Sequence, residues 1–158
     1  ERPLAEAIGL AIVRTGEGYL LEAHGTARVA GREVLDRTAL SDGAIIELGR
    51  SVRLRFRQPS ALSLSARLDF VSDHRPAQSV DGVVLLADTC LLGSGEENHI
   101  VCHDWSGQVL LVRQGLELWC RSRQALTVNG HRLGSGRRLQ SGDVVSGEES
   151  RFRIEIPN

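Results

Sequence analysis

Residues 110–156 read LLVRQGLELWCRSRQALTVNGHRLGSGRRLQSGDVVSGEESRFRIEI, and a second copy of their pattern lies at residues 11–56. Shifting the chain by 99 residues superposes seven identical residues without a gap, among them turn glycines and apolar positions. The identical pairs are Val13 and Val112, Arg14 and Arg113, Gly16 and Gly115, Val29 and Val128, Gly31 and Gly130, Leu40 and Leu139, and Gly43 and Gly142. One inserted residue then brings Val52, Leu54 and Phe56 onto Phe152, Ile154 and Ile156. The shared turns and alternation indicate two related β-units.

The composition excludes several function classes. The chain has 158 residues with 41 % hydrophobic content, which is enough to bury a core. The 19 basic and 20 acidic residues leave a net charge of -1, so no global field attracts nucleic acid or an anionic membrane. Every basic residue is Arg, which excludes mechanisms that depend on a lysine. We therefore expect no nucleic-acid or membrane partner and no cofactor.

The cysteines favour a reducing environment. Cys90, Cys102 and Cys120 are an odd number at wide spacing, which is a poor disulfide framework. Apolar runs such as residues 83–87 are far shorter than the roughly 20 residues of a membrane-spanning helix, and no charged-then-apolar leader opens the chain. We expect a cytoplasmic protein. Because the chain begins at Glu1 and not at Met, we also expect a processed or excised piece of a longer protein.

The local patterns predict an all-β fold. Residues 51–57 are the clearest strand, with Val52, Leu54 and Phe56 on one face and arginines on the other. After the break Gln58-Pro59-Ser60, residues 61–70 resume strict alternation, and this break is the predicted unit boundary. Residues 82–92 are predicted to form a buried strand or strand pair, and residues 73–80 a loop. Strand and turn signals recur about every ten residues, which is typical of an antiparallel sandwich.

Residues 61–156 resemble a forkhead-associated (FHA) domain, a family of β-sandwiches, in the order and spacing of its motifs. The correspondences to the family pattern run, in chain order, through Gly93-Ser94, residues 100–102, Ser106-Gly107-Gln108-Val109, residues 122–130 and Leu139-Gln140-Ser141-Gly142-Asp143. Val128-Asn129-Gly130 and the Leu-x-x-Gly-Asp segment are the most specific matches. The resemblance implies tandem FHA-like antiparallel β-sandwiches, with residues 1–59 the C-terminal half of one and residues 60–158 a complete degenerate copy.

The front half of the first sandwich is absent from this chain. A half sandwich leaves an open apolar face and unpaired edges. Residues upstream of Glu1 or another chain are therefore expected to supply the missing strands, unless the two units share a sheet.

FHA domains read phosphothreonine in partner proteins, and the resemblance therefore points to phosphate-binding loops at one end of the sandwich. This chain departs from the family pattern there. Ser94 stands at the Arg of Gly-Arg, Gly107 at the Arg of Ser-Arg, Val109 at the bracing His, and Gln124 at the Asn of Asn-Gly-Thr. Ser106 and Ser122 stand where the family has serines, whereas in the first unit Ala7, Ile8 and Leu10 occupy the Ser, Arg and His positions.

Two functions follow from these departures. The first is a non-catalytic protein-protein interaction or assembly module, without most of the phosphothreonine-binding residues, whose partner is another protein or a second copy of itself. The alternative is a phosphopeptide-binding adaptor in which Arg121 and Arg123 act as substitute phosphate ligands beside Ser106. The candidate ligand-binding residues are Ser94, Ser106, Arg121, Ser122, Arg123 and Gln124.

The sequence contains only incomplete patterns for a metal site and for a catalytic site. Only His99-x-x-Cys102 has the spacing of a zinc-ligand pair, and adjacent Cys102 and His103 point to opposite faces of a strand. Cys102-His103-Asp104 resembles a catalytic triad in content, but triads are assembled across a fold and not along consecutive residues. We therefore expect no metal site and no enzyme. Trp105 and Trp119 are expected to be core or near-core anchors.

Arg50, Arg53, Arg55 and Arg57 form the one local basic concentration. Bases would need aromatic platforms for stacking, and Phe56 lies on the opposite face of this strand. The arginines are interpreted as a solvated face that discourages edge pairing, or alternatively as a contact for an acidic partner.

Overall fold

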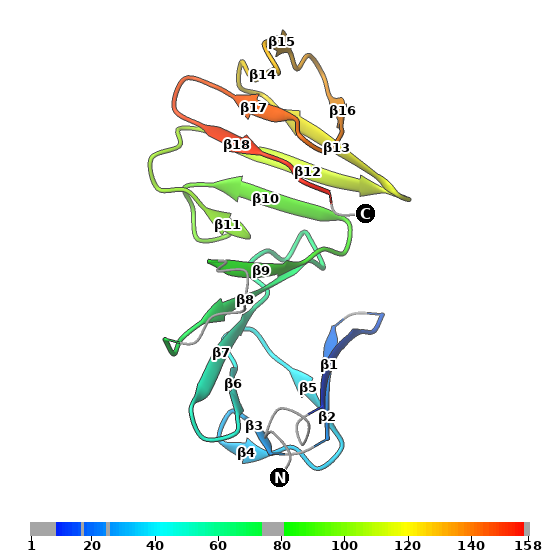
Figure 1. Ribbon diagram of the computed structural model, residues 1–158, viewed down its shortest axis with the longest axis vertical. Helices are drawn as coiled ribbons and strands as arrows, with labels where there is room; N and C mark the ends of the chain where they lie inside the picture. Colours follow the sequence, from blue (N-terminus) through cyan, green and yellow to red (C-terminus); the bar gives the residue numbers. More distant parts are fainter. Residues whose placement is uncertain (1–8, 17, 25, 74–80, 157–158) are drawn as a thin grey trace. The chain divides into compact units, whose positions relative to one another are not determined.

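The computed structural model describes residues 9–16, 18–24, 26–73 and 81–156. These residues form strands, turns and loops, and the predicted all-β class with antiparallel sheets is confirmed (Figure 1). The part of the chain described here contains no helix long and apolar enough to cross a membrane. Two compact units are present, one formed by residues 1–58 and 66–85 and the other by residues 59–65 and 86–158.

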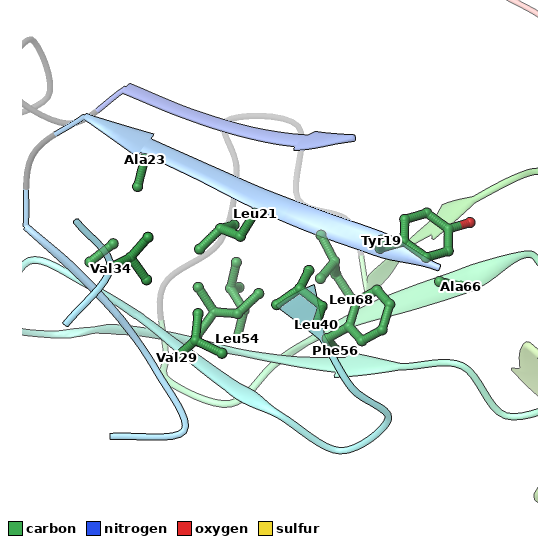
Figure 2. Packing of buried hydrophobic residues seen from close by; sticks show 12 residues of the cluster. Tyr19, Leu21, Ala23, Val29, Val34, Leu40, Leu54, Phe56, Ala66 and Leu68 are labelled. Atoms are coloured by element: carbon green, nitrogen blue, oxygen red, sulfur yellow. The ribbon is translucent and has the colours of Figure 1, made fainter. Parts of the chain in front are cut away.

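Unit 1 is built from two sheets. A three-stranded sheet has the order β1-β2-β5, and a six-stranded sheet has the order β4-β3-β6-β7-β8-β9. The strands are β1 (Gly9–Arg14), β2 (Tyr19–His24), β3 (Ala27–Val29), β4 (Arg32–Glu33), β5 (Arg37–Leu40), β6 (Ile45–Leu48), β7 (Val52–Arg57), β8 (Ala66–Phe70) and β9 (Gly82–Leu85). Leu21 and Ile46, one from each sheet, are fully buried, and Phe56 packs edge-on against Tyr19 (Figure 2). The two sheets therefore share one core.

The outer edge of β7 is covered by β8, and β9 pairs with the far edge of β8. Leu54 pairs with Phe70 and Phe56 with Leu68, so the apolar face of β7 continues onto β8. The break at residues 58–60 predicted that these two strands belong to the second unit, whereas they extend the sheet of the first. They supply part of the cover that the half sandwich was expected to need.

Unit 2 is also built from two sheets. Their strand orders are β11-β10-β12-β13-β16 and β15-β14-β17-β18. The strands are β10 (Thr89–Gly93), β11 (Ile100–Val101), β12 (Val109–Gln114), β13 (Glu117–Ser122), β14 (Thr127–Val128), β15 (His131–Arg132), β16 (Arg137–Leu139), β17 (Val144–Ser146) and β18 (Arg151–Arg153). Cys120 and Val109 from the first sheet and Val128 and Val145 from the second are buried. All pairs are antiparallel except β10 with β11.

Strand register repeats between the units at the predicted offset. Val13 lies opposite Leu20 in unit 1, and Val112 lies opposite Trp119 in unit 2, so both members of the pair are shifted by 99 residues. Further pairs between β3 and β6 recur in the same way between β14 and β17. The turn after β3 also recurs, because Ala30 and Asn129 have φ values of 52° and 53°. Left-handed backbone at this position suits Asn better than Ala.

The last hairpin corrects the predicted alignment. Val145 pairs with Phe152 as Ile46 pairs with Leu54, so the offset at this strand is 152 - 54, or 98 residues. The hairpin of unit 2 is thus one residue shorter than that of unit 1, whereas the predicted alignment made it one residue longer. Leu54 therefore corresponds to Phe152, and Ile156, which the predicted alignment matched to Phe56 of the apolar face, is 47 % exposed.

The segment before β8 also differs from its prediction. The strand begins at Ala66 and not at residue 61, and Leu62 is 95 % exposed despite its place in the alternating pattern. Ser63 and Ser65 are buried instead, because the Ser63 hydroxyl accepts the Ser65 N–H and donates to the Thr89 carbonyl. Serine-to-backbone hydrogen bonds here replace a strand ladder.

Other expectations fall partly outside the described residues. The predicted loop at residues 73–80 and the positions of Ala7 and Ile8 lie there, apart from residue 73. Of residues 82–92, which were predicted to be buried, β10 is buried but Val83 of β9 is 36 % exposed. The two strands belong to different sheets, so one burial pattern does not describe both.

Candidate functional site

One end of unit 2 carries most of the predicted ligand-binding residues on three loops. We call residues 94–99, 105–108 and 122–126 the loop cluster. The first segment follows β10, the second precedes β12, and the third begins at the last residue of β13. Ser94 and Ser106 are exposed on the first two loops, and Arg121 and Arg123 are exposed at the end of β13 and just after it. The loop cluster therefore places the predicted residues at the ends of neighbouring strands, as the resemblance implies.

A chain of neutral hydrogen bonds joins the three loops. Gln108 Nε2 donates to Asn98 Oδ1 over 2.8 Å, and the Asn98 amide donates to the Gly95 carbonyl over 2.9 Å. The Ser122 hydroxyl donates to the Gln108 carbonyl over 2.9 Å and accepts the Gln124 N–H over 3.1 Å. Asn98 is 2 % exposed, so this brace is partly inside the unit. Ser122, a predicted ligand residue, is occupied in holding the loops together.

Gln124 fills the space beside Gly107. A Cβ atom added at Gly107 would lie 2.5 Å from Gln124 Nε2 and 2.7 Å from its Cγ. This is the position at which the FHA pattern has an arginine. The Gln124 Nε2 atom is buried and has no hydrogen-bond partner within the described residues. The neutral amide of Gln124 thus lies against the backbone of Gly107 and makes no charge-assisted contact.

Arg123 lies between two open pockets. One is lined by Gly107, Gln108, Leu110, Arg123 and Gln124 and has a volume of about 610 Å³. The other has a volume of about 460 Å³ and is lined by residues 123–127 with Arg132 and Gly134. Neither Arg121 nor Arg123 forms an ion pair within the described part of the chain. The side chain of Arg121 instead packs against Gly136. A Cβ atom added at Gly136 would lie 3.2 Å from the Cγ of Arg121.

The structure brings some predicted residues together and leaves others apart. Ser122, Arg123 and Gln124 meet the loop of Gly107 and Gln108 through hydrogen bonds and a shared pocket. Ser94 and Ser106 make no side-chain hydrogen bond to any of them in the described residues. Hydrogen bonds and a shared pocket therefore join three of the six predicted residues.

The two most specific motif matches contact each other. Asn129 Nδ2 donates to Asp143 Oδ1 and the Gln140 N–H to Asp143 Oδ2, over 2.9 and 2.7 Å, while Val144 N–H donates to Asn129 Oδ1. We call this set the turn latch. The Gln140 N–H and the Asn129 amide hold the pKa of Asp143 below its usual value, against a smaller opposing effect of burial. At the offset of 99 residues, unit 1 has Ala30 and Ala44 in place of both partners.

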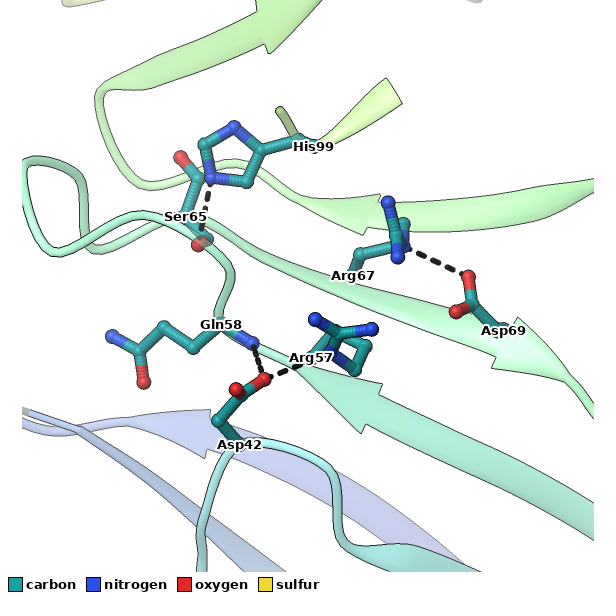
Figure 3. A network of polar contacts seen from close by, with 7 residues as sticks. All are labelled: Asp42, Arg57, Gln58, Ser65, Arg67, Asp69 and His99. Atoms are coloured by element: carbon teal, nitrogen blue, oxygen red, sulfur yellow. Dashed lines mark hydrogen bonds and ion pairs between the residues drawn. The ribbon is translucent and has the colours of Figure 1, made fainter. Parts of the chain in front are cut away.

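His99 is a structural residue of the core. It is fully buried; its Nδ1 accepts the Leu91 N–H over 2.9 Å, and its Nε2 lies 3.0 Å from the Ser65 carbonyl (Figure 3). The ring is therefore neutral with its proton on Nε2. Both nitrogens are used, so His99 has none left for the zinc-ligand pair with Cys102. The described residues contain no group of three or more potential metal ligands.

The three thiols are free and protonated at neutral pH. Burial raises the pKa of Cys90 to about 12 and that of Cys120 to about 11, and it also raises the pKa of the partly exposed Cys102. A nucleophilic cysteine needs a lowered pKa. Cys102, His103 and Asp104 therefore lack the electrostatics of a thiol active site.

The basic row of β7 is partly neutralised by neighbouring acids. Asp42 Oδ1 accepts from Arg57 Nε over 3.0 Å and from the Gln58 N–H over 2.9 Å, and Arg53 lies 4.0 Å from Glu47. On the neighbouring strand β8, Arg67 pairs with Asp69 over 2.9 Å (Figure 3). Burial raises the pKa of Asp42, but the hydrogen bonds from Gln58 and Arg57 outweigh it, so the pKa is lowered overall. Part of the basic row of β7 is thus engaged in contacts within unit 1.

Asn98 and Gln108 were missed by sequence reasoning. Gln108 stands inside a quoted motif, but nothing in the sequence marks it as the donor to Asn98 across two loops. Both tryptophans are half-buried. Trp105 stacks on Phe152 with 6.1 Å between ring centroids. Trp119 donates to Glu117 and lies on the face of β13 away from the buried Cys120, so the prediction of a core anchor is wrong for Trp119.

Comparisons with known proteins leave the family open. No family model, no curated protein and no solved structure matches this chain.

Proposed function

We propose that this chain is a non-catalytic protein-protein interaction or assembly module of FHA type that does not depend on phosphate. The observation that carries the proposal is the contact of Gln124 with Gly107. Recognition of a doubly charged phosphate against water needs bidentate or charge-assisted donors that converge on one point. Here Gly107 stands where the family pattern has an arginine, the neutral amide of Gln124 lies against it, and the nearby Ser122 hydroxyl already donates to the Gln108 carbonyl.

The chemistry of the remaining groups supports a binding role over catalysis. The Cys102 thiol has a raised pKa, which disfavours a thiolate nucleophile. The His99 ring uses both nitrogens within the core and is not available as a general base. The partner we propose is a protein, and the balance of 19 basic and 20 acidic residues favours neither nucleic acid nor a membrane.

A titration with phosphopeptides tests the proposal. The probe is a degenerate peptide library with a fixed phosphothreonine, used before and after treatment with a phosphatase. We expect isothermal titration to give no heat that depends on the phosphate. Binding that is abolished by dephosphorylation contradicts the proposal.

Arg123 supports a second candidate, a phosphopeptide-binding adaptor. Its side chain borders both pockets of the loop cluster, is exposed and has no ion-pair partner within the described residues. If this function holds, Arg123→Ala will abolish phosphate-dependent binding. Arg50→Ala, at an exposed turn of unit 1, removes the same charge and serves as the matched control.

A further inference from the structure

The outer edge of β18 lacks the neighbour that its counterpart in unit 1 has. β7 and β18 are counterparts because Ile46 pairs with Leu54 as Val145 pairs with Phe152. The sheet of unit 1 continues past β7 with β8 and β9, whereas the sheet of unit 2 ends at β18 within the described residues. The same kind of strand is thus internal in one unit and an edge in the other.

The backbone of β18 presents hydrogen-bonding groups to this edge. Ile154 donates its N–H to Asp143 and accepts at its carbonyl from Gly142, so its groups face inward. Alternate residues face the opposite way, which directs the N–H and carbonyl of Arg153 outward. In unit 1 the corresponding direction is occupied. Arg55, the counterpart of Arg153, lies opposite Asp69 of β8, and the carbonyl of Arg53, two residues earlier on the same edge, accepts the Val71 N–H over 3.0 Å. An unpaired edge of this kind is a template for an added strand.

The apolar side chains of β18 are less covered than their counterparts. Leu54 is 9 % exposed and Phe56 is fully buried beneath the sheet that β8 extends. Their counterparts Phe152 and Ile154 are only half-buried, although Trp105 stacks on Phe152. An added strand with apolar residues opposite these two would complete the face.

The charges of β18 specify the strand that would fit. On β7, Arg55 faces Asp69, but Arg57 faces Arg67. The counterparts on β18 are Arg153 and Glu155, so an antiparallel strand fits best with an acid opposite Arg153 and a base opposite Glu155. The order base, apolar, acid, apolar is the order of residues 67–70 of this chain, Arg-Leu-Asp-Phe. Their own strand is paired with β7 and serves here as the pattern for the ligand.

We propose that the outer edge of β18 binds an extended segment of a partner protein as an added antiparallel strand, with side chains in the order basic, apolar, acidic, apolar. Phe152 and Ile154 receive the apolar residues, and Arg153 and Glu155 receive the acid and the base. The inference rests on the proposed function and names the binding surface and the chemistry of the partner for it.

The test uses the full chain and a capped synthetic peptide with the sequence of residues 65–72, SARLDFVS. Isothermal titration is expected to show one-to-one binding, and hydrogen exchange followed by NMR is expected to show the Arg153 amide newly protected. Arg153→Glu turns an attractive cross-strand pair into a repulsive one and should weaken binding about fivefold. A peptide with Arg in place of its Asp should bind that variant again. Arg50→Glu makes the same change of net charge away from β18 and should bind as the unaltered chain does.

Several results overturn the inference. Absence of binding, binding without protection of Arg153, or failure of the charge-swapped peptide to restore binding each removes the proposed site. Protection of the Arg153 amide in the free chain shows that the edge is already paired, and a dimer in sedimentation then identifies a second copy as the occupant. None of these results bears on the phosphopeptide titration, which probes the loop cluster, so the two proposals fail separately.

Discussion

The turn latch between Asn129 and Asp143 allows a quantitative test of the packing of unit 2. Asp143→Ala removes two hydrogen bonds to a carboxylate, and because the site is partly solvated we expect a loss of about 2 kcal/mol in unfolding free energy. Asn129→Ala removes its bonds to Asp143 and to Val144 and leaves Ala in left-handed backbone, for a similar loss of about 2 kcal/mol. The bond between the two side chains is counted in both losses. The double variant should therefore lose about 3 kcal/mol, with a coupling of about 1 kcal/mol.

Urea unfolding followed by tryptophan fluorescence measures these losses. Both tryptophans of the chain, Trp105 and Trp119, lie in unit 2, so the signal reports that unit alone. Gln140→Ala is the matched control, since the donor to Asp143 is its backbone N–H, and it should cost less than about 0.5 kcal/mol. Strictly additive losses in the double variant, or an Asp143→Ala chain as stable as the unaltered one, would refute the latch.

The latch should also depend on pH. The folded pKa of Asp143 lies below its unfolded value, so its stabilisation is present above the unfolded pKa of about 3.9 and is lost as the pH falls through the folded pKa. The stability difference between the chain and Asp143→Asn should shrink in acid. A difference that stays constant down to about pH 2 contradicts the hydrogen-bonding account of the lowered pKa.

Three further predictions follow from the buried groups and from Asp42. His99→Phe leaves the Leu91 N–H and the Ser65 carbonyl unpaired, and it should lower the unfolding free energy by about 2–5 kcal/mol in urea titrations, whereas a loss under 1 kcal/mol argues against the bridge. At pH 8, Ellman's reagent should leave Cys90 and Cys120 unmodified in the folded chain and modify all three thiols in urea; rapid reaction of Cys120 without urea contradicts its burial and its pKa of about 11. Asp42→Asn, which weakens the bonds to Arg57 and Gln58, should cost about 1 kcal/mol at pH 7 and less in acid by thermal unfolding, and a cost that increases in acid contradicts the lowered pKa.

Alternation and turn glycines made most strands predictable. Residues 51–57 became β7 with Leu54 and Phe56 inside, and the glycine turns after β3 and β14 recur at the predicted offset of 99 residues. These features are local, because side-chain period and positive φ are properties of a few consecutive residues. The all-β class followed from them.

Which strand lies beside another in a sheet could not be predicted from these local patterns. Alternation shows which face of β8 is apolar, but it does not say whether β7 or another edge lies beside it. For that reason the pairing of Phe70 with Leu54 could not be predicted from the break at residues 58–60. Nor could the exposure of Leu62, because the serine hydrogen bonds that end the alternation reach across to Thr89.

The location of the candidate site could be predicted from the sequence, but the contacts between its side chains could not. Motif order placed Ser122, Arg123 and Gln124 at the loop end of unit 2, where the structure has them. The contact of Gln124 with Gly107 and the brace through Asn98 and Gln108 depend on side-chain directions across three loops. Such directions follow from tertiary packing and have no signal in single-sequence spacing.

The absence of a phosphate site in the loop cluster is the central claim, and it is tested most directly by NMR. The full chain, labelled with nitrogen-15, is titrated with the phosphothreonine peptide library and then with the same library after phosphatase treatment. The account predicts that the amide signals of Gly107, Ser122 and Gln124 respond alike to both. Shifts of these three amides that saturate with the phosphorylated library and vanish with the dephosphorylated one would contradict it.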